Sequence, residues 1–395
     1  MSAFLLRLHY FFKIFGLSTM SVKKLSKFNR YRFETSRKDL AYNVALILGF
    51  LLIGSYYTRV VWLMDYEGRS MFEKTCEVFD IVFAFSVSIT LYVLYCARQK
   101  RIVRLADRFY ALGRSLAGNS DELSKAIARR TRRTFVTYLI LYAIFTISAQ
   151  PVAINGYYLD HAVIAGLTLD FILLTVILQY CLVLICLVEM FAMVNRHLEG
   201  ISKRSSHKSY IEPRFKSSSN FLTFELYKSQ DSQFSYQRSQ YFSLCDLSQD
   251  LSDFFGLPML MVVSFIFFLI IFAIYYPART VINQVKIMGY TTLSSYCQTW
   301  FGFFATGYLL VVLTNSTARI GKEKERTAEI IIKWSAIVDN AATEKQLDQF
   351  YKYLQSKNVQ FSVFGLFKLD QSLLLSIVSS TTTYLVIILQ FRETK

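Results

Sequence analysis

The feature that most constrains this chain is a series of long apolar runs that contain almost no charge. Most are about as long as the roughly 20 residues that a helix needs to cross about 30 Å of hydrocarbon. A helix satisfies its own backbone hydrogen bonds in lipid, so such runs are best explained as spanning helices. The sequence therefore predicts an all-α integral membrane protein with seven transmembrane helices, at 41–64, 80–96, 135–154, 162–194, 257–276, 293–314 and 373–391.

The low content of charged residues is typical of a membrane protein. They make up 18% of the 395 residues, against about a quarter in soluble domains. The net charge is +16, but the basic residues, including those at 98–108 and 129–133, stand between the apolar runs and not on a soluble domain. We therefore expect contacts with anionic membrane lipids and no nucleic acid as a partner.

Loop charge predicts the orientation of the chain. One alternate set of segments between the runs contains 36 Lys and Arg residues, and the other set contains 6. Basic loops stay in the cytosol, so the N-terminus is predicted to be cytosolic and the C-terminus extracellular. G-protein-coupled receptors have the reverse orientation, and an Asn-Pro pair is missing from the seventh run. This class of receptor is therefore excluded.

The last apolar run is unusually dense in Ser and Thr. Steps of three and four residues place Ser376, Ser380, Thr383, Ile387 and Gln390 on one stripe of a helix, whose opposite side is mainly aliphatic. A polar stripe with an apolar back suits the wall of an ion pore. Small polar residues also mediate the packing of helices in bilayers, so the pattern alone leaves both explanations open.

Residues 383–391 contain a Thr-Tyr pair, five apolar residues and a Gln-Phe pair. This pattern resembles the signature that closes the seventh helix of insect gustatory receptors, which are related to insect odorant receptors. Upstream, residues 365–370 are similar to the segment that precedes this helix in the family. The signature positions are Thr383, Tyr384, Gln390, Phe391, Gly365 and Asp370.

The resemblance implies a ligand-gated, non-selective cation channel in the plasma membrane of chemosensory neurons, in the dendrite, cell body and axon. It implies a tetramer, either a homotetramer or a heteromer with related receptors, in which the seventh helices surround the pore. It also implies a cytosolic helical anchor domain and an outer constriction near Gln390. The expected pore and gate residues are Ser376, Ser380, Thr383, Ile387, Gln390 and Phe391.

The apolar runs and the resemblance together predict six regions. They are a cytosolic amphipathic segment (1–40), transmembrane helices 1–4 on the ligand-pocket side (41–194), a cytosolic loop and anchor helix (195–256), helices 5 and 6 (257–314), a cytosolic anchor segment (315–370), and the pore-lining helix with a short extracellular tail (371–395). The Ser-, Lys- and Gln-rich stretch 202–243 is expected to be partly disordered.

The ligand is expected to be a small organic tastant. Family members tuned to sugars usually carry Glu directly after the Thr-Tyr pair, whereas this chain has Leu385, which favours a bitter-type compound. Aromatic side chains near the outer ends of the helices form either an interfacial belt or a ligand pocket with a few polar groups. The candidate ligand-binding residues are Tyr57, Trp62, Gln150, Tyr157, Asp160, His161, Asp170, Tyr276 and Trp300.

The sequence contains little that indicates catalysis or metal binding. The four His residues do not stand at metal-ligand spacing, and we expect no enzymatic activity, no metal and no cofactor. Glu189, near the inner end of its helix, is expected to pair with a base, with Arg196 as a candidate. Whether Cys76 and Cys297, both on the predicted outer side, form a disulfide is left open. The alternative functions are an odorant-receptor-like subunit or a secondary transporter, although no internal repeat is visible.

Overall fold

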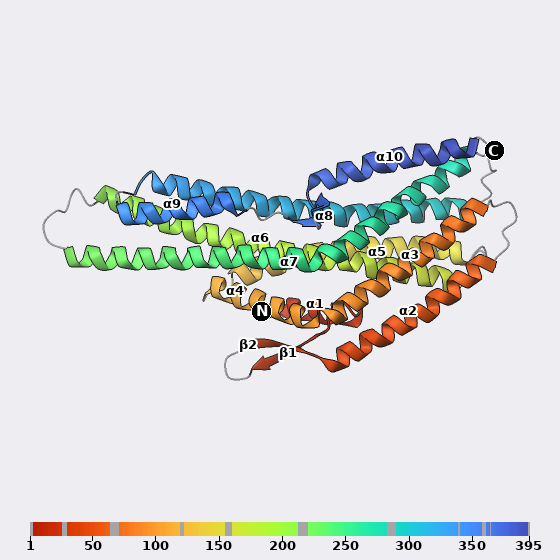
Figure 1. Ribbon diagram of the computed structural model, residues 1–395, viewed down its shortest axis with the longest axis horizontal. Coiled ribbons are helices and arrows are strands. Elements are labelled where there is room, and N and C mark those ends of the chain that lie inside the picture. The colour runs from red at the N-terminus through yellow and green to blue at the C-terminus, as the bar shows by residue number, and fades with distance from the viewer. Residues whose placement is uncertain are drawn as a thin grey trace.

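The computed structural model describes residues 3–25, 30–63, 71–118, 122–154, 160–211, 220–282, 290–338, 340–357, 361–363 and 365–393. In this part of the chain, long helices run side by side and two short hairpins lie beside them (Figure 1). The elements are α1 (Ala3–Ile14), β1 (Met20–Leu25), β2 (Arg30–Thr35), α2 (Arg37–Leu63), α3 (Met71–Ala97), α4 (Gln99–Ala117), α5 (Glu122–Ile154), α6 (Asp160–Ile211), α7 (Asn220–Ile282), α8 (Tyr290–Ser335), α9 (Ala341–Ser356), β3 (Ser362–Val363), β4 (Phe367–Lys368) and α10 (Gln371–Glu393).

The prediction of a mostly helical protein with several apolar helices is confirmed. Among the described residues, five helical stretches are long and apolar enough to cross a membrane: Arg37–Leu63, Lys74–Ala97, Gly166–Ser205, Asp231–Tyr275 and Trp300–Ser335. Residues Gln371–Ile387 of α10 form a shorter apolar helix. The run predicted at 135–154 forms the C-terminal part of α5.

Helix α6 is at the centre of the fold and packs on α5, α7 and α8. Its side chains are buried around most of its circumference, as at Val176, Leu184 and Val194. A helix that is apolar all round belongs in the interior of such a bundle. Helix α2, in contrast, packs mainly on α3 and leaves Leu52 exposed, so its outer face is suited to lipid.

The long helices α6, α7 and α8 continue beyond their apolar parts at one end of the molecule, where α9 packs beside α8 (Figure 1). The Phe234 ring meets Trp334 edge-on at a centroid distance of 5.0 Å. Phe350 of α9 lies 5.4 Å from Tyr241 in the same cluster. These buried rings form an aromatic core outside the apolar runs that the sequence predicts at 257–276 and 293–314.

Helices cover much of the stretch 202–243, for which partial disorder was expected, and that expectation stays a prediction. Helix α6 continues to Ile211 and α7 begins at Asn220, and only residues 212–219 of this stretch lie outside the described part of the chain. The overall composition concealed a helical spacing of apolar residues, because Phe234, Tyr241 and Leu244 are all buried on one side of α7.

The N-terminal segment contains a hairpin that the sequence pattern did not predict. Strands β1 and β2 are antiparallel, with Met20 opposite Thr35 and Lys23 opposite Arg32. The hairpin is held against α4, because the Phe33 backbone N–H donates to the Asp107 carboxylate at 3.2 Å. The segment predicted at 1–40 therefore contains the helix α1 followed by this hairpin.

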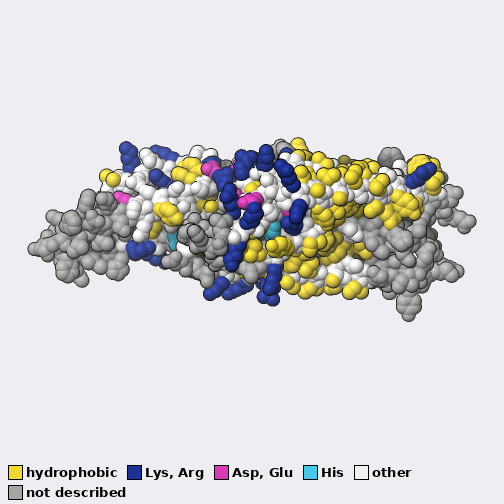
Figure 2. Space-filling view, turned by 90° about the horizontal axis from the view of Figure 1, so that it is seen from below, with side chains coloured by type: hydrophobic (Ala, Val, Ile, Leu, Met, Phe, Trp, Pro, Cys, Tyr) yellow, Lys and Arg dark blue, Asp and Glu magenta, His cyan; other side chains and the backbone are white. Residues whose placement is uncertain are grey.

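Basic and apolar side chains gather on different parts of the surface. In the face shown in Figure 2, Lys and Arg gather across the middle and on one half of the molecule, while apolar side chains cover most of the described part of the other half. Some of these bases have protein partners: Arg108 of α4 pairs with Asp250 of α7, and Arg101 lies 3.9 Å from Asp253. The stretch 98–108 therefore binds α7 as well as facing solvent.

Candidate functional site

Helix α10 is preceded by a tight hairpin that explains part of the signature. Strand β3 pairs with β4, with Ser362 opposite Lys368 and Val363 opposite Phe367. Gly365 occupies the turn with a φ of +73°. Only glycine adopts this left-handed backbone conformation without a steric cost, which gives a physical reason for the glycine at this position.

The first turn of α10 is fastened to its neighbours by backbone and capping hydrogen bonds. Leu369 is buried, and its N–H donates to the Phe361 carbonyl at 2.8 Å. Its own carbonyl accepts a hydrogen bond from the Thr317 hydroxyl of α8. The Asp370 carboxylate accepts from the Ser372 N–H at 2.9 Å and from the Ser372 hydroxyl at 2.6 Å. The start of α10 is therefore held against α8.

The Ser372 hydrogen bonds also affect the charge of the cap. They stabilise the ionised carboxylate and hold the pKa of Asp370 below its usual value. An ionised Asp at this position also interacts favourably with the positive end of the helix dipole. Asp370 therefore acts as the N-terminal cap of α10.

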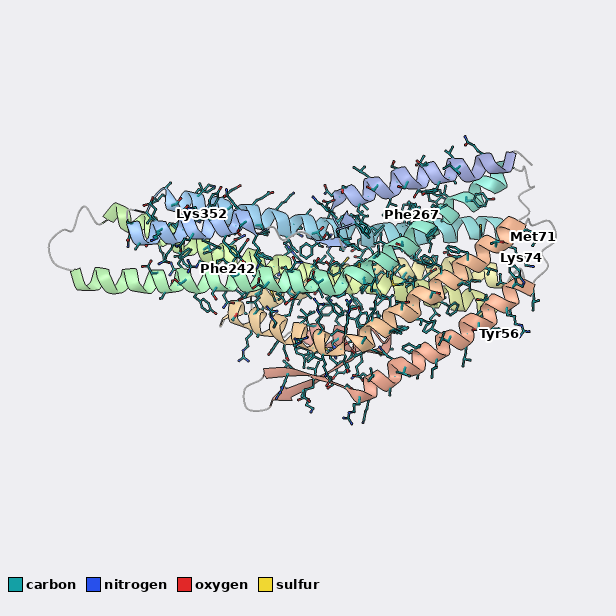
Figure 3. The ribbon with its side chains drawn as sticks, in the orientation of Figure 1. Tyr56, Met71, Lys74, Phe242, Phe267 and Lys352 are labelled. Carbon is teal, nitrogen blue, oxygen red and sulfur yellow. The ribbon has the colours of Figure 1, made fainter. Side chains whose placement is uncertain are left out.

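One face of α10 packs against α7 and α8. Leu373, Ile377 and Thr381 are buried on this face. The Tyr384 ring of the signature meets Phe267 of α7 edge-on, at a centroid distance of 5.8 Å. Figure 3 shows Phe267 on the part of α7 that runs beside α10. Tyr384 therefore helps to set the rotation of α10 about its own axis.

The expected pore stripe lies beside this packed face. Ser376, Thr383, Ile387 and Gln390 are exposed, and Ser380 is half-buried. The side chain of Phe391 lies outside the described ones. The Ser376 hydroxyl donates to the Ser372 carbonyl at 2.9 Å, and the Thr383 hydroxyl donates to the Ser379 carbonyl at 3.1 Å. These hydroxyl oxygens still have lone pairs that can accept from water or contact cations.

A third face of α10 is exposed and mainly apolar, and the Thr382 hydroxyl on this face donates to the Val378 carbonyl at 2.9 Å. Leu375 is 74% exposed and Val378 is 64% exposed. This face can meet lipid without cost, whereas polar groups exposed to hydrocarbon are unfavourable. Water or another protein surface in front of the polar stripe would therefore be more favourable than lipid.

The structure describes the side chains of four candidate ligand-binding residues, and it does not show them converging. Tyr57 and Trp62 lie on α2, with the Lys74 ammonium of α3 5.7 Å from the Trp62 ring centroid. Figure 3 places Lys74 and Met71 at this end of α3 and Tyr56 near them on α2. Trp300 of α8 is 57% exposed and packs on Phe303 and Phe304 of its own helix. The side chains of Gln150, Tyr157, Asp160, His161 and Tyr276 lie outside the described ones.

Asp170, the fourth of these residues, is half-buried on α6, next to a ring cluster that the sequence analysis missed. Phe171 lies 4.9 Å from Phe15, which directly follows α1, and 4.7 Å from Tyr142 of α5, measured between ring centroids. The Tyr138 hydroxyl lies 3.1 Å from the Thr175 hydroxyl. The spacing of Tyr138 and Tyr142, four residues apart, could have indicated this buried face of α5.

Glu189 has a different partner from the one expected. The buried Glu189 carboxylate forms its ion pair with Arg130 of α5, while Arg196 pairs with Glu122. Pairing with a base is thus confirmed, and the choice of Arg196 is wrong because α5 crosses α6 at this level. The side chain of Cys297 lies outside the described ones, so its pairing with Cys76 stays untested.

Solved structures with the same architecture are insect olfactory receptors. The chain resembles the olfactory receptor OR5 from Machilis hrabei with a TM-score of 0.68, and the same receptor in complex with eugenol with a TM-score of 0.71. Each alignment covers 98% of this chain and 97% of the other, at 10% sequence identity. At this identity the likeness establishes a shared fold and nothing finer.

Sequence comparisons identify the family. The chain belongs to the 7tm chemosensory receptor family, whose sequence profile matches residues 5–395. It is 27% identical over 156 residues to gustatory receptor 28a of Drosophila melanogaster, and 27% identical over 150 residues to gustatory receptor 28b. Each match covers 38% of this chain, and 34% and 32% of those relatives. The chain therefore matches about a third of the length of these relatives, and its resemblance to insect gustatory receptors is confirmed.

Proposed function

We propose that this chain is a subunit of a ligand-gated, non-selective cation channel that detects a small organic tastant, bitter-type rather than sugar. In this proposal the chain crosses the plasma membrane of a chemosensory neuron seven times. Four subunits, identical or related, place their α10 helices around a central pore. The signature at the end of α10, the family and the shared fold support the proposal, which includes no enzymatic activity.

The exposed polar stripe of α10 is the observation that carries this proposal. Ser376, Thr383 and Gln390 are exposed on one stripe of a largely apolar helix, which packs against α7 and α8 through a different face. A neighbouring subunit and a water-filled pore would satisfy these groups, whereas lipid would not. Exposed Leu375 and Val378 lie on a different face, which suits lipid or a subunit contact.

The gate is proposed at Ile387 and Gln390. Four isoleucine side chains around a narrow pore would exclude water and stop ion flow without a tight seal. A small rotation of α10 would replace this ring with the Gln390 amides, whose carbonyl oxygens attract cations. Because Tyr384 packs on Phe267 of α7, a movement of α7 provides a mechanical route to such a rotation.

The ligand pocket is proposed on the outer halves of α2, α3, α5, α6, α7 and α8. Its candidates are the aromatic residues and polar groups named above, with Asp170 as the only described acid among them. The OR5 receptor with eugenol shows that this fold can accept a small organic molecule. The absence of an acid at Leu385 is the feature of this chain that argues against a sugar ligand.

The test is to record currents from cells that express the chain alone or with a related receptor, during exposure to bitter compounds and sugars. Ile387→Ser should produce current without ligand, because a polar ring no longer excludes water. Gln390→Glu should raise the permeability of divalent relative to monovalent cations by roughly threefold or more, because four carboxylates attract divalent ions.

Leu375→Ser is the matched control, since it places the same polar group on another exposed face of α10. It should leave resting current and ion selectivity unchanged. If Ile387→Ser and Gln390→Glu reach the cell surface and also change neither property, α10 does not line the pore. Solute flux without unitary currents would instead indicate a transporter.

A further inference from the structure

A cavity of about 350 Å³ lies between α5, α6 and α8. These three helices pack side by side along the centre of the molecule (Figure 1). The cavity volume is at the lower end of the range of small-molecule sites, about 300 to 1,000 Å³. Its lining includes two glutamates, Glu189 and Glu323, and five arginines from the three helices: Arg129, Arg130, Arg196, Arg319 and Arg326.

Three of these arginines have carboxylate partners. Arg130 pairs with Glu189, Arg196 pairs with Glu122, and Arg326 lies 2.9 Å from Glu199. These ion pairs hold the guanidinium groups in place and leave part of their donor capacity free, because each guanidinium carries five N–H donors. The cavity is therefore lined by oriented cationic donors.

The other two arginines have no acidic partner among the residues that the structure describes. Arg129 of α5 and Arg319 of α8 are exposed at the cavity, on two different helices. The five arginines outnumber the two glutamates of the lining, so the potential in this concave site, where field lines are focused, is positive. An anion that enters would find donors on every helix of the cavity.

The cavity lies at the boundary of the apolar region. Arg129 precedes the apolar run that starts at Phe135 by six residues, or roughly 9 Å along the helix. Arg319 follows the run that ends at Thr314 by five residues, or roughly 8 Å. With the proposed orientation, this level corresponds to the phosphate groups of the inner leaflet.

We propose that this arginine-lined cavity binds a multiply phosphorylated inositol, either as the headgroup of a membrane phosphoinositide or as the free inositol phosphate. Arginine forks bind phosphate oxygens in pairs, so a polyol with several phosphates can engage Arg129 and Arg319 together. The size of the cavity suits a headgroup and excludes a folded protein partner. Arg319 stands two residues after Thr317, whose hydroxyl holds the start of α10, so the bound anion contacts the same part of α8.

The experiment uses the purified full-length chain in nanodiscs of phosphatidylcholine. Inositol trisphosphate is titrated calorimetrically, and phosphatidylinositol bisphosphate in phosphatidylcholine nanodiscs is detected by native mass spectrometry. Binding should weaken by roughly tenfold or more in Arg129→Gln/Arg319→Gln, because charge-assisted phosphate contacts are lost. If both probes bind, the cavity recognises the phosphorylated headgroup without its acyl chains. If only the lipid binds, recognition requires the membrane-held form.

Arg132→Gln/Arg133→Gln is the matched control, because it removes the same charge from the same helix outside the cavity. This variant should change the affinity less than twofold. Equal weakening of binding in both variants would overturn the proposal, since it would indicate general attraction to a basic surface. Failure of the unmodified chain to bind either probe would overturn it as well. If the glutamine variant does not fold, Arg129→Lys/Arg319→Lys keeps the charge, loses the forks, and should still weaken binding several-fold. The readout is binding and does not depend on channel activity.

Discussion

At the scale of single residues, a buried histidine is the clearest source of pH dependence. His9 of α1 is buried, and its Nδ1 lies 3.2 Å from the Ser18 hydroxyl. Burial disfavours the charged imidazolium and, together with Lys13 nearby, lowers the pKa of His9 to about 4, although Asp39 acts in the opposite direction. The folded protein therefore keeps this ring neutral.

This neutral ring makes stability depend on pH. Between the unfolded pKa near 6.5 and the folded pKa near 4, the unfolded chain binds a proton that the folded chain does not. Stability should therefore fall as the pH decreases through this window, by about 3 kcal/mol in all, and should be unaffected above it. Thermal unfolding of His9→Gln in detergent, compared with the unmodified chain from pH 7 to pH 4.5, should show a smaller loss of stability. If stability depends on pH equally in the variant and the unmodified chain, His9 is not the source of the pH dependence.

At the scale of elements, α10 is specified by the residues immediately before it as much as by its own. The Gly365 turn reverses the chain, Leu369 is buried, and Asp370 caps the helix through Ser372. Helix propensity would allow α10 to begin at several positions. The cap and the Thr317 hydrogen bond select one start and so one rotational position for the polar stripe.

Removal of the cap should loosen the first turn of α10. Asp370→Ala should destabilise the helix by about 1 kcal/mol, the usual value for the loss of a helix N-cap. The measurement is hydrogen exchange of peptides that cover residues 371–378, which should exchange faster in the variant. Asp348→Ala is the control, because Asp348 of α9 has only an exposed ion pair with Lys352. Unchanged exchange in Asp370→Ala would show that the cap contributes nothing.

At the scale of the whole molecule, the helices are longer than the membrane requires. Helices α6, α7 and α8 extend past their apolar parts into the half of the molecule where basic side chains gather (Figure 2). The aromatic contacts of Phe234, Tyr241 and Phe350 hold these extensions together. This arrangement supports the proposal of an anchor on the basic side of the membrane.

The basic half is expected to face the cytosol. An epitope added at the C-terminus should therefore bind antibody on intact cells, and one added at the N-terminus should bind only after the cells are permeabilised. Sugar attached at Asn315, which lies in the same half of α8 as Arg319, would contradict this orientation. Equal labelling of the two epitopes on intact cells would contradict it as well.

The sequence by itself determined the class of the fold and the family. Hydrophobic run length is a local property, and so is the 383–391 signature, so neither needs knowledge of distant contacts. The same holds for the polar stripe, since its spacing follows from the geometry of one helix. These inferences agree with the apolar helices and the family match.

Only the tertiary structure decided which residues meet across helices. The partner of Glu189 is Arg130, 59 positions away in the chain, and no local pattern favoured it over Arg196. The arginine cavity and the ring cluster around Phe171 likewise join residues from separate helices. Packing also adds to the interpretation of α10, because burial of Leu373 and Ile377 shows which face meets α7 and α8 and which faces stay exposed. The physical reason is that helix length and periodicity are local properties of the chain, whereas the rotation and crossing of helices are set by their side chains together.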